Sequence, residues 1–169
     1  MEELQHCEIL KTKINVTNMS DTIKYICSHL DELRGKYICV SNVHTTVMSY
    51  ENEEYRKIQN SAAMALPDGA PLSSYSRRKG YKDAQRVTGP DLMLELFKIS
   101  MQGGYRHYFY GATEETLAAM RQVLERDYPG IEIAGMYAPP FRETTQEEDE
   151  QIIQQINESR PDFIWVGLG

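Results

Sequence analysis

The sequence has only three cysteines, Cys7, Cys27 and Cys39, and they follow no CxxC or other metal-ligand spacing. An odd number of cysteines cannot close into a complete set of disulfides, so no disulfide framework is expected. Proteins that keep their thiols free are typical of a reducing compartment. We therefore expect a cytoplasmic protein without a cysteine-based metal site.

Long apolar runs and an excess of positive charge are missing as well. No stretch approaches the ~20 apolar residues of a membrane span, and the opening residues MEELQHCEILKTK lack the apolar core of a signal peptide. There are 18 Lys and Arg against 25 Asp and Glu, which gives a net charge of -7. A general nucleic-acid binder needs a basic surface, so we expect no nucleic-acid partner. Peripheral attachment to a membrane stays open, because it needs only a patch or an amphipathic tail.

What the chain does contain is an alternation of strand and helix patterns. Its 169 residues, 41% of them hydrophobic, suffice for one core, so a single domain over residues 1–169 is expected. Strand formers gather at residues 36–41, 105–111, 131–135 and 162–169, and helical patterns cover 20–34, 114–128 and 145–160. Ser20 or Asp21 is expected to cap the first of these helices and Thr113 the second. This order predicts an α/β fold with a doubly wound, mostly parallel, Rossmann-like sheet and helices on both faces. Residues 7–21 predict a small β-hairpin leading into a helix.

Small and polar residues follow the apolar segments, where the strands are expected to end. The residues in these positions are Asn42, His44 and Thr45 after the first strand, Asp68 after Met64–Pro67, and Gly111, Tyr137, Gly167 and Gly169 farther along. Ligands of open α/β sheets bind beyond the carboxyl ends of the strands, so these residues are candidates for a binding site.

The segment QRVTGPDLM, residues 85–93, adds a second candidate group. Thr88, Gly89 and Asp91 surround a proline that fits the first turn of a helix, where free N–H groups suit a phosphate or a sugar hydroxyl. Arg86 would add a planar donor fork for a diphosphate. The same residues would also serve as an ordinary capped helix start.

Asp68 lies between Pro67 and Gly69, and this position has two interpretations. Pro-Asp-Gly is a common turn sequence, in which the aspartate only shapes the backbone. A carboxylate held at a strand end is also well placed to take a proton from an incoming hydroxyl. The residues alone leave both open.

From about Asn42 to Gly169 the sequence resembles the WecG/TagA/CpsF family of bacterial glycosyltransferases, glycosyltransferase family 26. The motifs that carry the resemblance are LPDG at 66–69, RVTGPDL at 86–92 and VGLG at 166–169, in that order and spacing.

The resemblance implies an inverting transfer, without metal or cofactor, from a UDP-sugar to an undecaprenyl-diphosphate-linked sugar at the cytoplasmic face of the membrane. Family members that transfer N-acetylmannosamine make the linkage disaccharide of wall teichoic acid or an intermediate of common antigen. Others build capsule or exopolysaccharide from related hexoses.

Carried over residue by residue, the family pattern makes Asp68 the general base. The asparagine that follows the first core strand in the family corresponds to Asn42. Val40 stands where family members commonly have threonine. We further assign His44, Thr45, Arg86, Thr88, Gly89 and Asp91 to substrate binding, and Gly111, Tyr137, Gly167 and Gly169 to the nucleotide.

The family's GLGxPxQE loop and basic tail would follow Gly169, so the resemblance implies a C-terminally truncated chain. We expect the tail to hold the enzyme on anionic lipid and the truncated chain to form a homo-oligomer through the surface that the tail would cover.

Two other functions stay open at this point. The chain could be a non-catalytic module that binds sugar nucleotides. It could also be a Rossmann-like oxidoreductase, although no GxGxxG follows its first predicted core strand.

Overall fold

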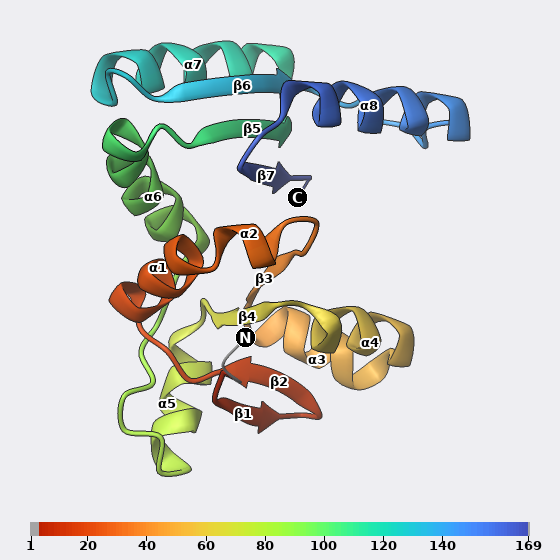
Figure 1. The fold of residues 1–169 in the computed structure, drawn as a ribbon. Helices are drawn as coiled ribbons and strands as arrows, with labels where there is room; N and C mark the ends of the chain where they lie inside the picture. The colour runs from red at the N-terminus through yellow and green to blue at the C-terminus, as the bar shows by residue number, and fades with distance from the viewer. Residues whose placement is uncertain (1–3, 169) are drawn as a thin grey trace. The chain divides into compact units, whose positions relative to one another are not determined.

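The computed structural model describes residues 4–168, which form two compact units, one ending at Glu95 and the other beginning at Leu96 (Figure 1). Parallel strand pairs and helices in both units confirm the predicted α/β class. The expectation of one core over residues 1–169 stays a prediction. Within residues 4–168, none of the helices has the length and apolar character needed to cross a bilayer.

The first unit opens with the predicted hairpin, in which β1 (His6–Ile9) pairs antiparallel with β2 (Thr12–Asn15). Its turn residues, Leu10 and Lys11, have φ angles of 49° and 65°, as a tight two-residue hairpin turn requires. Apolar hairpin side chains lie in a buried cluster whose members are Cys7, Ile9, Ile14, Ala65 and Leu72. The hairpin is therefore part of the core of this unit.

The next helix differs from its prediction. α1 (Met19–Ser28) begins at Asn18, whose side chain accepts a hydrogen bond from the Asp21 N–H at 3.0 Å. A separate short helix, α2 (Leu30–Leu33), follows His29, whose ring Nδ1 lies 2.9 Å from the Tyr25 carbonyl oxygen. The prediction of one helix over 20–34 capped at Ser20 or Asp21 is wrong, because Asn18 is the cap and the chain turns at His29.

Two parallel strands carry the candidate residues of the first unit. β3 (Ile38–Ser41) leads through α3 (Val43–Glu51) and α4 (Glu53–Ser61) to β4 (Met64–Pro67), which is buried along its whole length. Their register pairs Ile38 with Met64 and Ser41 with Pro67. α5 (Ala70–Arg78) follows β4, and α6 (Gly89–Gly103) takes the chain from the first unit into the second.

The second unit has a three-stranded parallel sheet in the order β6-β5-β7. The chain runs from β5 (Arg106–Gly111) through α7 (Glu114–Asp127) to β6 (Glu132–Tyr137) and then through α8 (Gln146–Ser159) to β7 (Phe163–Gly167). The chain thus places β6 on one side of β5 and then crosses over to place β7 on the other side. Right-handed crossovers in opposite directions place α7 and α8 on opposite faces, which is the doubly wound pattern. The reversal lies between the carboxyl ends of β5 and β7, where such sheets bind ligands.

An aromatic cluster around Phe97 of α6 fills one face of this sheet. The Phe97 ring centroid lies 5.0 Å from that of His107, 5.9 Å from Phe109, 5.4 Å from Tyr128 and 6.0 Å from Trp165. All four contacts are edge-to-face, the arrangement that the charge distribution of aromatic rings favours. The cluster joins α6, the end of α7 and two strands of the sheet.

His107 is fully buried within this cluster and has a complete set of hydrogen bonds. Trp165 Nε1–H donates to His107 Nδ1 at 3.0 Å, so the ring proton lies on Nε2, 2.8 Å from Ser100 Oγ. Ser100 in turn donates to the Leu96 carbonyl oxygen at 2.6 Å. Burial lowers the pKa of His107 to about 4, although the Asp162 carboxylate acts in the opposite direction. The neutral imidazole is therefore the folded form.

This arrangement predicts a loss of stability in acid. Because unfolding restores the ordinary His107 pKa of 6.5 from about 4, the unfolded state takes up a proton as pH falls through this range. We expect the free energy of unfolding to drop by about 3 kcal/mol between pH 6.5 and pH 4 through this group, at about 1.4 kcal/mol per pH unit. Urea unfolding followed by the fluorescence of the single tryptophan, Trp165, measures it. His107→Gln should be less stable at pH 7 and lack this part of the slope. Parallel stability curves for both proteins would contradict the assignment.

Candidate active site

The register of β3 and β4 brings Asn42 and Asp68 together at the carboxyl ends of the two strands. Ser41 pairs with Pro67, and the Asp68 N–H donates to the Ser41 carbonyl oxygen at 2.9 Å. A Cβ built on Gly69 would lie 3.7 Å from the Asn42 Cα, in ordinary contact. The two candidate residues are therefore neighbours, although 26 positions separate them in the chain.

The Arg86 side chain contacts both the backbone and the side chain of Asp68. Its Nε–H donates to the Asp68 carbonyl oxygen, and its Nη2 lies 3.5 Å from the Asp68 Oδ1. The segment is held in place by Val87, which is fully buried and donates its N–H to the Pro67 carbonyl oxygen at 2.9 Å. The Asp68 side chain remains 26% exposed, so its carboxylate is oriented by Arg86 and still accessible from solvent.

The start of α6 lies at the same place and carries the other residues of the RVTGPD motif. Thr88 Oγ1 accepts from the Asp91 N–H at 3.1 Å and donates to Asp91 Oδ2 at 2.5 Å, so Thr88 is the cap of this helix. A Cβ on Gly89 would lie 3.4 Å from a methyl group of Val40. Val40, at the position where threonine is common in the family, thus packs against the backbone of the α6 start.

The structure also gives Asn42 and Thr45 a structural role. Asn42 Oδ1 accepts from the Thr45 N–H at 3.1 Å, and Thr45 Oγ1 accepts from the Asn42 N–H at 3.0 Å, which is a reciprocal capping box at the start of α3. His44 is exposed in the same first turn. Both candidate side chains of the box are engaged with the backbone, while the His44 ring is open to solvent.

In the second unit, Gly111 and Gly167 meet at the carboxyl ends of β5 and β7. A Cβ on Gly111 would lie 2.1 Å from the Gly167 carbonyl oxygen, and Gly111 has a φ angle of 131°. Ala112 follows in the left-handed region at φ 59°, and its N–H donates to the same Gly167 carbonyl oxygen at 3.2 Å. Only glycine fits position 111, because any side chain would collide with the neighbouring backbone.

Tyr137 ends β6 beside a second tyrosine that the sequence analysis missed. Its ring stacks on Tyr110 of β5 at a centroid distance of 5.9 Å and an interplanar angle of 15°. The register between these two strands shifts by one residue between His107 and Tyr108, and the Tyr108 ring occupies the space beside Gly135. Burial, and after it the neighbouring Tyr137 and Tyr110, raise the pKa of Tyr108. The paired tyrosine rings therefore belong to one aromatic surface near the sheet edge.

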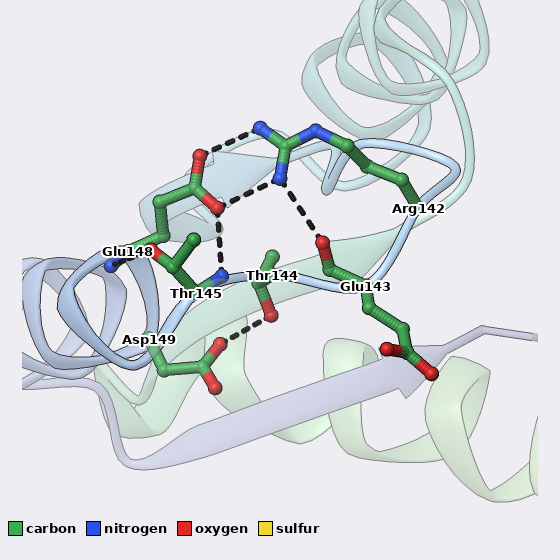
Figure 2. Close-up of polar contacts among 6 residues, drawn as sticks. All are labelled: Arg142, Glu143, Thr144, Thr145, Glu148 and Asp149. Atoms are coloured by element: carbon green, nitrogen blue, oxygen red, sulfur yellow. Dashed lines mark hydrogen bonds and ion pairs between the residues drawn. The ribbon is translucent and has the colours of Figure 1, made fainter.

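The loop from β6 to α8 is fixed by a polar cluster (Figure 2). Arg142 donates two hydrogen bonds to the Glu148 carboxylate, at 2.8 Å and 2.6 Å, and a third to the Glu143 carbonyl oxygen at 3.1 Å. Glu148 also accepts from the Thr145 N–H at 2.9 Å as part of the α8 capping box. The Arg142 hydrogen bonds are the main cause that lowers the pKa of Glu148 to about 2. This carboxylate is thus fully ionised at neutral pH.

The clamp between Arg142 and Glu148 lies near the candidate nucleotide residues. Tyr137 is among the groups that raise the pKa of Arg142, after the dominant contribution of Glu148. Phe141, between two prolines and this clamp, is 91% exposed. Sequence reasoning missed Arg142. The partner of Arg142 is Glu148, six residues later, and the sequence marks Glu148 only as part of a helix cap.

The candidate residues thus form two groups, each within one unit. The first contains Asn42, His44, Thr45, Asp68, Arg86, Thr88, Gly89 and Asp91. The second contains Gly111, Tyr137 and Gly167 at one edge of the β6-β5-β7 sheet. Gly169 lies outside the described residues.

Comparison with known proteins identifies the family of the chain. Residues 7–169 match the Glycosyl transferase WecG/TagA/CpsF family over nearly the whole chain. The chain belongs to this glycosyltransferase family. The resemblance inferred from the LPDG, RVTGPDL and VGLG motifs is therefore confirmed.

Curated members of the family include three similar proteins, each named N-acetylglucosaminyldiphosphoundecaprenol N-acetyl-beta-D-mannosaminyltransferase. The one from Bacillus spizizenii (strain ATCC 23059 / NRRL B-14472 / W23) is 30% identical over 84% of this chain and 53% of its own length. Those from Bacillus subtilis (strain 168) and Staphylococcus aureus (strain NCTC 8325 / PS 47) are both 25% identical, over 90% and 96% of this chain. The chain spans between about half and two thirds of these family members, at 53%, 58% and 63% of their lengths.

The contact between Gly111 and Gly167 predicts that the same substitution destabilises the protein at position 111 and not at position 167. Gly111→Ala puts a methyl group onto a backbone oxygen at a positive φ angle, so we expect a loss of about 2–4 kcal/mol in the free energy of unfolding. Gly167→Ala is the matched control, because nothing lies within 4 Å of a Cβ there. It should change stability by less than about 1 kcal/mol. Denaturant titration of both variants measures the difference, and equal stability would show that the close approach does not exist in solution.

Proposed function

We propose that this family member takes part in transfer of N-acetylmannosamine, or a related hexose, from a UDP-sugar to a diphosphopolyprenol-linked sugar. The names of its relatives support this acceptor, since each is a mannosaminyltransferase of N-acetylglucosaminyldiphosphoundecaprenol. The product belongs to bacterial cell-surface polymers such as teichoic acid, capsule or exopolysaccharide. The reaction takes place at the inner face of the cell membrane, where a protein attached peripherally meets both substrates.

One observation carries the proposal: an accessible carboxylate, Asp68, is held at a strand end by Arg86 and beside Asn42. In an inverting transfer, the acceptor hydroxyl oxygen attacks the anomeric carbon from the side opposite UDP. Asp68 accepts the hydroxyl proton as the new C–O bond forms, and UDP leaves with the electrons of the broken bond. The anomeric configuration is inverted in one step, and neither metal nor cofactor is needed.

The remaining residues of the first unit suit the acceptor. The Arg86 side chain is 57% exposed at the strand end, so its guanidinium group can bind an anionic group while it orients Asp68. His44 is exposed one turn away and can donate to a sugar hydroxyl or a phosphate. Thr88, Gly89 and Asp91 form the helix start beside them and would shape this side of the acceptor site.

The sheet edge of the second unit suits the nucleotide. The turn at Gly111 and Ala112 lies at the reversal point of a doubly wound sheet, where nucleotides commonly bind. The stacked pair of Tyr110 and Tyr137 offers an aromatic surface for the uracil ring. We assign Gly111, Gly167 and Gly169 to the donor side, where small residues let the diphosphate approach the backbone.

Replacement of the proposed base tests the reaction. Asp68→Asn keeps the shape of the side chain and removes its basicity, so we expect turnover to fall by about 100-fold or more while UDP affinity is unchanged. The matched control is Asp83→Asn, an exposed aspartate of the same unit, which should turn over like the parent. Product formation by mass spectrometry with a UDP-N-acetylmannosamine donor is the measurement. Equal turnover in Asp68→Asn would remove Asp68 from the mechanism, and UDP binding without any turnover in the parent would favour a sugar-nucleotide-binding module.

The aromatic surface predicts a second effect, on the donor alone. Tyr137→Ala removes a stacking partner, so we expect UDP affinity to weaken roughly 10-fold, within the range of base–aromatic stacking. Tyr137→Phe keeps the ring and should bind UDP like the parent. Calorimetric titration with a chelator present measures both and checks that no divalent ion is required. If Tyr137→Ala binds UDP as tightly as Tyr137→Phe, the base lies elsewhere.

A further inference from the structure

Helix α3 has its apolar side chains on the outside. Its buried residues are Thr46 and Ser49, at 2% and 0% exposure, whereas Val43, Val47 and Tyr50 are exposed at 46%, 37% and 51%. The three exposed residues occupy positions i, i+4 and i+7 and therefore form a continuous stripe along one side of the helix. We call these three residues the α3 stripe. Ordinary surface helices show the reverse distribution, so the stripe calls for an apolar partner.

The orientation of α3 is fixed by contacts of its backbone and of its buried side. Thr46 Oγ1 donates to the Asn42 carbonyl oxygen at 2.7 Å, which ties it to the helix start. The Ser49 hydroxyl is buried without a hydrogen-bond partner among residues 4–168. Burying this hydroxyl while leaving valines in water is unfavourable in both respects. The helix is fixed this way by the capping box at its start and by its packing beside α4.

The stripe begins at the candidate acceptor residues. Val43 directly follows Asn42, which neighbours Asp68. From there the stripe extends away from the strand ends for roughly 10 Å, the length of seven helical residues. If the reacting sugar of an acceptor lies at Asp68, the rest of that acceptor can contact the α3 stripe along its whole length.

At the far end of the stripe, a tyrosine, a lysine and an exposed leucine lie together, which is typical of surfaces at a membrane interface. The Lys11 ammonium lies 5.4 Å from the centroid of the Tyr50 ring, and Leu10 beside it is 47% exposed at the hairpin turn. Arg56 donates to the carbonyl oxygens of Ser49 and Tyr50 at the end of α3. Glu53 pairs with Lys57 at 3.1 Å and lies near Lys11 and Arg56. With Glu51 and Glu54 close to it in sequence, three carboxylates balance these three cations, so the region carries no net positive patch for anionic headgroups. Hydrocarbon, rather than lipid charge, fits it.

We infer that the α3 stripe binds the polyprenyl chain of the lipid-linked acceptor where the chain leaves the bilayer. This inference rests on the proposed function, because it takes the acceptor to be a diphosphopolyprenol. It adds a surface that positions the acceptor through its lipid, separate from the residues that contact the diphosphate and the sugar. Binding of the chain removes Val43, Val47 and part of Tyr50 from water, and that burial is its driving force.

The test compares two variants of the 169-residue chain. Val47→Gln combined with Tyr50→Gln makes the stripe polar with a residue that forms helices well. The matched control is Val123→Gln, a valine of α7 in the second unit that is 43% exposed. Circular dichroism confirms that both variants remain folded. Each protein is sedimented with phosphatidylcholine vesicles that contain a few per cent of undecaprenyl diphosphate, and with vesicles that contain none.

We expect the parent and Val123→Gln to partition equally onto the vesicles with undecaprenyl diphosphate, and the double variant to partition about tenfold less. Equal partition of all three proteins, or no binding by the parent, would overturn the inference. A change in oligomeric mass of the double variant with unchanged partition would also overturn it, and would make the stripe a contact between two copies. An equal loss of binding to phosphatidylcholine vesicles that contain phosphatidylglycerol in place of undecaprenyl diphosphate would point to headgroup recognition and overturn the hydrocarbon assignment.

A soluble acceptor separates this inference from the proposed function. With a short alkyl chain in place of the polyprenyl chain, the parent and the double variant should transfer sugar at the same rate. Equal transfer together with reduced vesicle binding supports both proposals. Reduced vesicle binding without transfer by any of the proteins would leave the lipid surface supported and the proposed reaction refuted.

Discussion

The candidate site depends on the parallel pairing of β3 and β4. Each strand has four residues, and the register that pairs Ser41 with Pro67 is extended by one hydrogen bond from the Asp68 N–H to the Ser41 carbonyl oxygen. Met64, Ala65 and Leu66 of β4 are all buried, so the strand is packed on both faces and holds Asp68 at its carboxyl end. Arg86 reaches Asp68 only because Val87, buried beside it, pairs with the last residue of the same strand.

The second unit reaches the same kind of order through different contacts. Its sheet edge is shaped by a backbone approach at Gly111 that excludes any side chain, and its core is an aromatic cluster with a neutral histidine. The His107 ring is bonded on both nitrogens, so burying it does not leave an unpaired polar group. Position 111 thus serves the fold, whatever its part in ligand binding. Asn42 and Thr45, two candidates of the first unit, are likewise held by the fold, through their capping box.

Helix α3 combines a fixed orientation with an unusual distribution of side chains. Its capping box and its contact with α4 hold the polar side inward, so that valine and tyrosine side chains face solvent next to the candidate acceptor residues. The proposed lipid surface depends on this orientation. The stripe has only three residues, so the helix carries an apolar surface within a chain whose net charge is -7.

The sequence by itself determined the elements with local signals. The alternation of apolar segments and capped helices predicted the parallel strands, the hairpin and the helix that follows Thr113, because capping and periodicity depend on neighbours along the chain. It also predicted that Asn42 and Asp68 would follow strands and that Gly111 would end one, and three ordered motifs predicted the family. Where two caps compete nearby, as Asn18 and Ser20 do, local signals were insufficient and the helix start was misplaced.

Only the tertiary structure decided which of these residues meet and which side of an element is buried. The contact of Arg86 with Asp68 depends on strand pairing, and the stacking of Tyr110 on Tyr137 depends on a bulge in the β5–β6 register. The clamp between Arg142 and Glu148 depends on the path of a loop that returns to its own helix cap. The outward-facing valines of α3 would be assigned to the core from their type alone. Burial is a property of what packs against a residue, and the chain brings those neighbours together only when it folds.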